Sequence, residues 1–459
     1  MPVRGTAAGD GEGHAAEGWR PVRRVYLLLT LLSTLAASLI WGINTLFLLD
    51  AGLSNTQAFA ANAFFTAGMV LCEIPTGVVA DTRGRRASFL LGAGTLLVTT
   101  LLYLLMWQTQ GPFLGWALAS AGIGLGFSFF SGAVEAWLVD ALGATGYTGS
   151  LESMFAKGQI VSGAAMLSGS VAGGFIAQLT NLGVPYVIRA ALLGVTLVAA
   201  ALFMRDLGFA PHDRAGAAEE VKRVLQQSIA GGLGNRPVRW LMLAAPFTQG
   251  VSIYAFYAMQ PYLLELYGDE TAFGIAGLAA AIVAGSQILG GVAVPAVRRI
   301  VSRRTHALIG AVVISVIALA LLGATSSFWL ALGLLVAWSL VSAASLPLRQ
   351  AYLNGLIPSG QRATVLSFDS LMGSAGGVVT QPALGRVADV GGYGASYLVS
   401  AVITAAALPF VVLARRENAP SDPVRAGAPV PETGVGLPPE AAAVEPLAPP
   451  AERGDRGGS

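Results

Sequence analysis

Twelve long runs of apolar residues constrain the fold of this chain more than any other feature. They lie near residues 25–49, 58–80, 87–106, 114–138, 158–178, 186–204, 240–263, 272–296, 305–324, 328–348, 364–388 and 394–414. Several exceed the roughly 20 residues that a helix needs to cross a bilayer. Of the 459 residues, 54% are hydrophobic and 11% are charged, against about 25% charged in a typical soluble domain. The sequence therefore predicts an all-α membrane protein with twelve transmembrane helices.

Polar segments divide the runs into two sets of six. The predicted parts are an N-terminal tail (1–23), a first six-helix bundle (24–205), a linker (206–238), a second bundle (239–416) and a C-terminal tail (417–459). The last part is rich in Pro, Ala and Gly and has no apolar periodicity, which predicts disorder. A short stretch near Glu219–Ile229 has charged residues on one side of a helix and apolar residues on the other. It either lies along the membrane surface or, as we favour, only joins the two sets.

Basic residues gather on one side of the predicted membrane protein. They are Arg20, Arg23, Arg24, Arg83, Arg85, Arg86, Lys157, the linker, Arg298–Arg304, Arg362 and Arg415–Arg416. Cytoplasmic loops carry an excess of Lys and Arg, so both termini are expected in the cytoplasm. The first run is about 25 residues long and lacks an A-x-A-like cleavage site, and it is therefore interpreted as a span.

Cysteine and histidine usage argues against redox or metal chemistry. The single cysteine, Cys72, lies in an apolar run, and the three histidines (His14, His212 and His306) all lie outside the span interiors. We therefore expect no cofactor, no metal and no nucleic-acid partner, and a monomer in contact with lipid. The many Ala, Gly and Arg residues with only two lysines predict a bacterial plasma-membrane protein.

One loop between the second and third runs carries a specific motif. Residues Gly77 to Arg86 fit the pattern G-x-x-x-D-x-x-G-R-[RK], and this resembles the signature loop between helices 2 and 3 of the major facilitator superfamily of secondary transporters. In the second half, Pro295 and Arg299 follow Gly291 at matching offsets, without the acid. Such a degenerate repeat fits two related six-helix bundles. The resemblance implies a major facilitator fold that works by alternating access.

The same resemblance implies a gate on the basic side. Its members are Gly77, Asp81, Gly84, Arg85, Arg86 and, in the fourth run, Asp140. In such transporters the acid of the fourth helix pairs with the loop arginine, here Arg85. The loop acid, here Asp81, faces the start of helix 11, where the helix dipole favours a carboxylate. An ordinary interface ion pair is the alternative.

Charged residues within the apolar runs are functional candidates, because charges at membrane depth are costly. Glu73 and Glu135 are the candidate proton carriers, since an apolar setting favours a reversibly neutral carboxyl. A structural hydrogen bond is the alternative for each. Arg349 and Asp369 are predicted to form a structural ion pair. Arg189 either extends to the interface or meets an anionic group.

Polar and aromatic residues of the first and seventh runs are the candidate lining of a substrate cavity. They are Trp41, Asn44, Gln249, Tyr254, Tyr257 and Gln260. Aromatic faces with scattered amides suit amphiphilic or cationic organic molecules. For Tyr257 the alternative is a place in the outer aromatic belt.

Two further motifs of drug–proton antiporters are incomplete. Ser120 stands where an arginine precedes the G-x-G of Gly124 and Gly126, and the Gly169–Gly174 element lacks its proline. The segments Glu73–Gly77 and Arg362–Ser367 nevertheless resemble bacterial drug-efflux-type members. We therefore expect a proton-coupled exporter of small organic molecules or drugs. The alternatives are a proton-coupled or facilitated importer of a metabolite and, more remotely, a membrane enzyme or scaffold.

Overall fold

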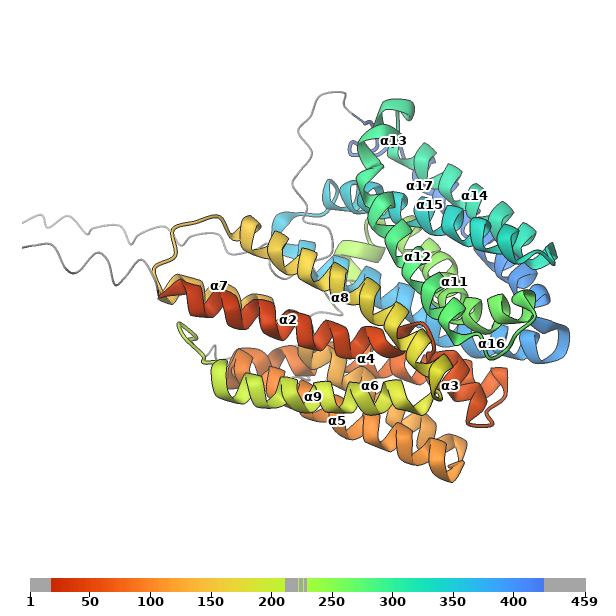
Figure 1. Ribbon diagram of the computed structural model, residues 1–459. Helices are drawn as coiled ribbons and strands as arrows, with labels where there is room; N and C mark the ends of the chain where they lie inside the picture. The colour runs from red at the N-terminus through yellow and green to blue at the C-terminus, as the bar shows by residue number, and fades with distance from the viewer. Residues whose placement is uncertain (1–17, 211–221, 223–225, 227–228, 425–459) are drawn as a thin grey trace, which may run out of the picture.

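The fold is a bundle of long helices (Figure 1). A computed structural model describes residues 18–210, 222, 226 and 229–424, and within them the only β-type pairing is an isolated bridge between Arg303 and Pro423. The first half contains α2 (Trp19–Trp41), α3 (Asn44–Asp50), α4 (Asn55–Arg83), α5 (Arg85–Thr109), α6 (Phe113–Phe130), α7 (Ala133–Ala144), α8 (Leu151–Leu179) and α9 (Gly183–Phe203).

The second half contains η1 (Ile229–Leu233), α11 (Arg236–Tyr267), α12 (Phe273–Val292), α13 (Val294–Ile300), α14 (Arg304–Ala324), α15 (Phe328–Asn354), η2 (Ser359–Gln361), α16 (Arg362–Ala405) and α17 (Leu408–Arg416). In Figure 1 the helices of the first half lie together below those of the second half. The predicted short helix near Glu219–Ile229 falls mostly on residues 219–221, 223–225 and 227–228, which lie outside the described residues.

The helices confirm the predicted all-α membrane class, although the count of spans differs from twelve. Among the described residues, ten helices are long and apolar enough to cross a membrane. One of the ten runs from Thr364 to Arg416 and contains a break at Gly392, where φ is 78°, so it includes both of the last two predicted runs. The seventh run corresponds to α11, which is 32 residues long but contains Pro246, Pro261 and several polar side chains.

The helix ends define two faces of the bundle. We call the face that carries Arg20, Arg85, Arg205, Arg304 and Arg416 the arginine-rich face, and the other the opposite face. Hydrogen bonds link helix ends on the arginine-rich face within each half. Trp137 Nε1 donates to the Arg205 carbonyl at 2.6 Å, and Trp240 Nε1 donates to Glu417 Oε1 at 3.1 Å.

Two membrane helices of the first half are broken. α2 ends at Trp41 and α3 begins at Asn44, while α6 ends at Phe130 and α7 begins at Ala133 after Gly132, whose φ is 67°. Broken helices are tolerated at membrane depth where protein or a cavity satisfies the freed backbone groups. The two breaks place Asn44 and Glu135 in the first turns of new helices.

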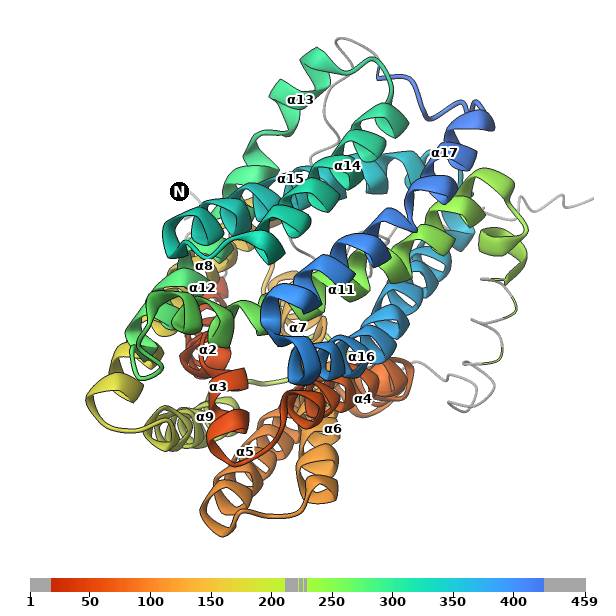
Figure 2. The same cartoon turned by 90° about the vertical axis from the view of Figure 1, so that its right-hand side faces the viewer.

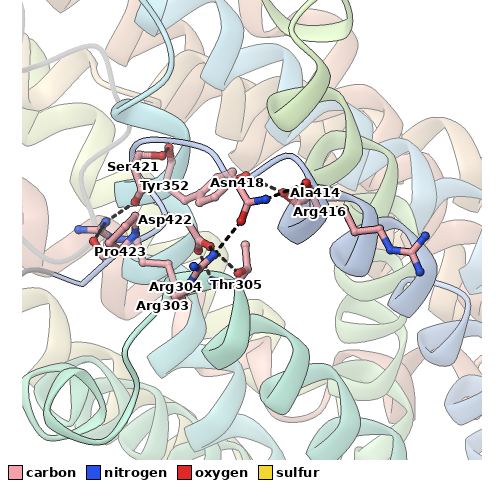
Figure 3. A network of polar contacts seen from close by, with 10 residues as sticks. All are labelled: Arg303, Arg304, Thr305, Tyr352, Ala414, Arg416, Asn418, Ser421, Asp422 and Pro423. Atoms are coloured by element: carbon pink, nitrogen blue, oxygen red, sulfur yellow. Dashed lines mark hydrogen bonds and ion pairs between the residues drawn. The ribbon is translucent and has the colours of Figure 1, made fainter.

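The start of the C-terminal tail is folded, which differs from the predicted disorder of 417–459. Residues Glu417 to Val424 pack across the ends of α14 and α15 (Figure 3). Asp422 is 1% exposed and accepts hydrogen bonds from the Thr305 amide at 2.8 Å and the Thr305 hydroxyl at 2.9 Å. The first amides of a helix have no partner within it, so this carboxylate caps α14. Residues Glu417 to Val424 are ordered because they dock onto α14, and composition alone does not indicate this docking.

We expect replacement of Asp422 by alanine to destabilise the second half by about 1–2 kcal/mol, because the first turn of α14 loses its cap. The measurement is the thermal unfolding midpoint of the purified protein in detergent. Glu270→Ala is the matched control, since Glu270 is an exposed acid in a loop of the opposite face. Equal midpoints for the two variants would contradict the capping role.

Candidate functional site

The loop between α4 and α5 is built around Gly84. Its φ of 102° suits glycine, and a Cβ there would lie 2.4 Å from Asp206 Oδ2. Asp206 accepts a hydrogen bond from the Arg86 amide at 2.9 Å, so it caps the start of α5. The sequence reasoning missed Asp206, although an acid directly after the last run of the first half was a usable signal.

Three of the predicted gate residues meet on the arginine-rich face. Arg85 Nη1 lies 2.6 Å from Asp81 Oδ1, and Arg85 Nε lies 3.9 Å from Asp140 Oδ2. Arg86 instead donates from Nη2 to the Ala201 carbonyl at 2.8 Å, which ties the loop to α9. A Cβ on Gly77 would meet nothing within 4 Å, so packing does not require this glycine here. The predicted approach of Asp81 to the start of α16 stays a prediction.

The two candidate proton carriers lie on two helices of the first half, Glu135 on α7 and Glu73 on α4. Glu135 is half-buried in the first turn of α7 and interacts electrostatically with Tyr26 of α2. Glu73 is exposed on α4, two residues before Pro75. The Thr76 hydroxyl donates to the Ser128 carbonyl at 3.2 Å, which fixes α4 beside the end of α6. Glu135 therefore lies next to the break between α6 and α7, and its role as a proton carrier stays a prediction.

Arg189 lies inside the first half rather than at the membrane interface. It is 1% exposed. Its Nε donates to Thr100 Oγ1 and its Nη1 donates to the Ala36 carbonyl, both at 3.1 Å. The predicted alternative in which Arg189 extends to the interface does not fit this buried position, because the guanidinium is held by α5 and α2.

Polar contacts join the two halves near the break between α2 and α3. Gln260 of α11 accepts from the Thr45 amide at 2.9 Å and donates to the Trp41 carbonyl at 2.8 Å. Its side chain is fully buried. Gln260 was predicted to line a cavity, and in this structure it binds backbone groups of the first half at the break.

Further contacts between the halves continue this polar layer, at the opposite face and deeper along α4 and α16. The Gly274 amide of α12 donates to Gln178 Oε1 of α8 at 2.9 Å, and Gln381 Nε2 of α16 lies 3.3 Å from Thr66 Oγ1 of α4. Figure 2 shows α4 beside α16. The sequence reasoning missed these residues because polar side chains in separate runs gave no signal of their pairing.

The acid of this layer is Asp389, near the end of the first stretch of α16. Its Oδ1 accepts from the Asn55 amide at 2.9 Å, and its Oδ2 accepts from the Thr56 amide at 2.9 Å and from the Thr56 hydroxyl at 2.5 Å. The Tyr393 hydroxyl also bonds to Asn55 Oδ1. Asn55 and Thr56 are the first residues of α4, so an acid of the second half caps a helix of the first half.

The remaining predicted cavity residues have different surroundings. Tyr254 is fully buried and donates to Ser396 Oγ at 2.6 Å, and its place in a substrate cavity stays a prediction. Its ring packs against Tyr397 of the second half and Phe59 of the first half. Asn44 donates to Asn62 Oδ1 and accepts from the Tyr186 hydroxyl, both at 2.9 Å. Gln249 is exposed and Tyr257 is half-buried, while Trp41 packs against Phe256.

An ion pair lies inside the second half. Arg349 Nη2 lies 2.6 Å from Asp369 Oδ1, and Arg349 Nη1 bonds to the other carboxylate oxygen. Arg349 also donates to the Leu241 carbonyl at 3.1 Å. The arrangement is bidentate and links α15, α16 and α11.

No group of three or more His, Cys, Asp or Glu side chains suited to a metal ion occurs within residues 18–210, 222, 226 or 229–424.

Comparisons with known proteins agree on the fold. The family model described as Major Facilitator Superfamily matches residues 26–300 and 288–451, which confirms the resemblance drawn from the signature loop. A comparison with curated proteins finds no match.

Several solved transporter structures share the architecture. The nucleoside transporter NupG is 11% identical with a TM-score of 0.69, over 85% of this chain and 98% of that one. A D-xylose-proton symporter is 16% identical with a TM-score of 0.62, over 85% and 97%. A bacterial homolog to the human lysosomal transporter Spinster, inward-facing and unoccupied, is 17% identical with a TM-score of 0.63, over 88% and 98%. At these identities the likeness concerns the fold alone.

Proposed function

This chain belongs to the major facilitator superfamily of transporters, and we propose that it exports small organic molecules in exchange for protons by alternating access. The single observation that carries the proposal is the distribution of polar contacts over the two faces. Asp81, Arg85 and Asp140 gather on the arginine-rich face, whereas Gln260 and Asp389 bind the first half on the other side. Separate contacts at the two faces suit halves that rock about a central site.

The orientation follows from the distribution of basic residues. We assign the arginine-rich face to the cytoplasm of a bacterial cell, because cytoplasmic loops collect Arg and Lys. The opposite face is then external, and the polar layer between the halves closes it. Asp81, Arg85 and Asp140 form the internal gate in this proposal, together with Gly84 and Arg86, which shape the loop.

We infer the substrate class from the side chains near the break between α2 and α3 and along α11 that remain available to a substrate. Trp41 and Tyr257 offer aromatic faces, and Gln249 offers an exposed amide. Such a lining favours amphiphilic or cationic organic molecules, since cation–π and stacking contacts tolerate many shapes. A metabolite importer is the alternative, and the nucleoside transporter and the D-xylose-proton symporter that share the fold are in keeping with it.

Cellular accumulation separates export from import. We expect cells that express the protein to accumulate less of a cationic dye than cells with an empty vector, and dissipation of the proton gradient to remove the difference. Unchanged dye levels, together with faster growth on one nutrient, would favour the importer. In proteoliposomes, a substrate flux that ignores an imposed pH gradient would exclude proton coupling.

Glu135 is the proposed carrier of the coupled proton. We expect Glu135→Gln to reduce proton-driven efflux about tenfold or more, because the amide cannot take up or release the proton. Exchange of labelled for unlabelled substrate, which needs no net proton movement, should persist. Glu152→Gln is the matched control, since Glu152 is an exposed carboxylate at the start of α8. Equal loss of efflux and exchange in Glu135→Gln would indicate a structural role instead.

A further inference from the structure

A cavity of about 330 Å³ lies at the end of the last helix on the arginine-rich face. Val412, Arg415 and Arg416 of α17 line it, together with Asn418 just after the helix. The candidate membrane span that contains α17 ends at Arg416. The cavity therefore lies at the level where the hydrocarbon of a bilayer gives way to lipid head groups.

The cavity carries two positive charges, on Arg415 and Arg416. Among the described residues, no acid lies within ion-pair distance of either guanidinium. Nη1 of Arg415 is buried and has no hydrogen-bond partner, and in Figure 3 the Arg416 side chain extends away from the network around Asp422. The acid that follows in the chain, Glu417, accepts from Trp240 Nε1. A buried donor without an acceptor is costly, so these groups suit an anionic ligand.

The neighbouring residues of α17 favour an amphiphile over a free ion. Leu408 and Val412 are half-buried apolar residues one helical turn apart, and Arg415 and Arg416 follow Val412 by a further turn. Residues three and four apart share one face of a helix. The apolar strip of Leu408 and Val412 thus leads from the bilayer interior to the two guanidinium groups. A phospholipid has the same order of parts, because its phosphate suits guanidinium groups and its acyl chains suit the strip.

We propose that this cavity binds the phosphate of an anionic glycerophospholipid, with the acyl chains along the apolar strip. Arg415 and Arg416 hold the phosphate. Asn418 completes the lining, and its Oδ1 accepts from Arg303 Nη1 at 2.9 Å. The bound lipid therefore contacts both the last helix and the folded start of the C-terminal tail. The site goes beyond the proposed function, since it lies at the rim and takes no part in the transport pathway.

Native mass spectrometry of the full-length protein tests the site without any substrate. The protein in detergent is titrated with dioleoyl-phosphatidylglycerol, which is anionic, and with dioleoyl-phosphatidylcholine, which has the same acyl chains and no net charge. Inorganic phosphate at millimolar concentration is added in a third arm. We expect the first phosphatidylglycerol to bind about twentyfold more tightly than phosphatidylcholine, with a factor of about five from each arginine. Inorganic phosphate should not displace it.

Arg416→Gln should weaken the binding of phosphatidylglycerol about fivefold, because one positive charge at the phosphate is lost. Arg415→Gln/Arg416→Gln should remove the preference for phosphatidylglycerol over phosphatidylcholine. Val412→Asn should weaken the binding of both lipids, since it interrupts the apolar strip. Arg416 is exposed, so the single variant keeps the test decisive if the double variant fails to fold.

Arg205→Gln is the matched control. Arg205 is an exposed arginine just after α9, on the arginine-rich face of the first half, and it does not line the cavity. Its replacement removes the same charge and should leave the affinity for phosphatidylglycerol unchanged. Equal affinities of the wild type for the two lipids, or an equal loss in Arg205→Gln and Arg416→Gln, would overturn the proposal. Displacement of the lipid by inorganic phosphate would also overturn it, in favour of a free anion. None of these results bears on proton-coupled export, which dye efflux tests separately.

Discussion

Replacement of Gly277 by leucine is expected to reduce transport at least tenfold, by preventing the opposite face from closing. A Cβ at Gly277 would lie 2.5 Å from the Ser170 carbonyl oxygen and 3.0 Å from the Gly174 Cα. Both neighbours are backbone atoms of α8, so α8 and α12 must move apart to make room. Overpacking of this kind costs about 1–3 kcal/mol. It should destabilise the conformation in which the opposite face is closed and so favour the conformation in which that face is open.

The measurement is substrate flux in proteoliposomes, together with the distance between two spin labels on the opposite face. The labels are attached to cysteines that replace the exposed residues Thr109 and Ser326. Gly285→Leu is the matched control, because Gly285 lies on the same helix and a Cβ there would meet nothing within 4 Å. Normal flux with an unchanged distance in Gly277→Leu would show that the close approach of α8 and α12 does not limit the cycle.

The second large effect is expected from the ion pair of the second half. Asp369→Asn should destabilise the folded protein by about 3 kcal/mol, because the guanidinium of Arg349 loses its bidentate partner in a largely buried place. The side chains of Arg349 and Asp369 are 20% and 7% exposed, so water screens little of this loss. The thermal unfolding midpoint in detergent should therefore fall well below that of the wild type.

A paired replacement distinguishes a structural from a functional ion pair. In Arg349→Met/Asp369→Leu no charge is left unpaired, and much of the lost stability should return. Recovery of stability together with normal transport would assign a purely structural role. A stable double variant without transport would instead place the pair in the transport cycle.

Local patterns explain what could be predicted from the sequence. Apolar runs predicted nearly every helix, because a bilayer demands about 20 apolar residues wherever the chain crosses it. The signature loop predicted the pairing of Arg85 with Asp140, whose Oδ2 lies 3.9 Å from Arg85 Nε, whereas the closer contact of Arg85 with Asp81 at 2.6 Å was not predicted. The less apolar α11 was predicted as well, as the run near 240–263, although it contains two prolines and several polar side chains.

The contacts between the halves could not be predicted in the same way. Asp389 binds Asn55 across 334 positions of sequence, and nothing in either local pattern indicates the partner. For Tyr254, an aromatic residue in an apolar run suggested a cavity, and the local pattern did not indicate that its hydroxyl binds Ser396 in the core. Both outcomes depend on how whole helices approach each other.

The cap of α14 has a consequence for the order in which the chain is made. Thr305 receives its cap from Asp422, which is synthesised 117 residues later. A growing chain therefore inserts α14 with its first turn unsatisfied, and the cap arrives only after the last crossing has emerged from the ribosome. A chain interrupted before Asp422 therefore lacks the carboxylate that satisfies the first turn of α14.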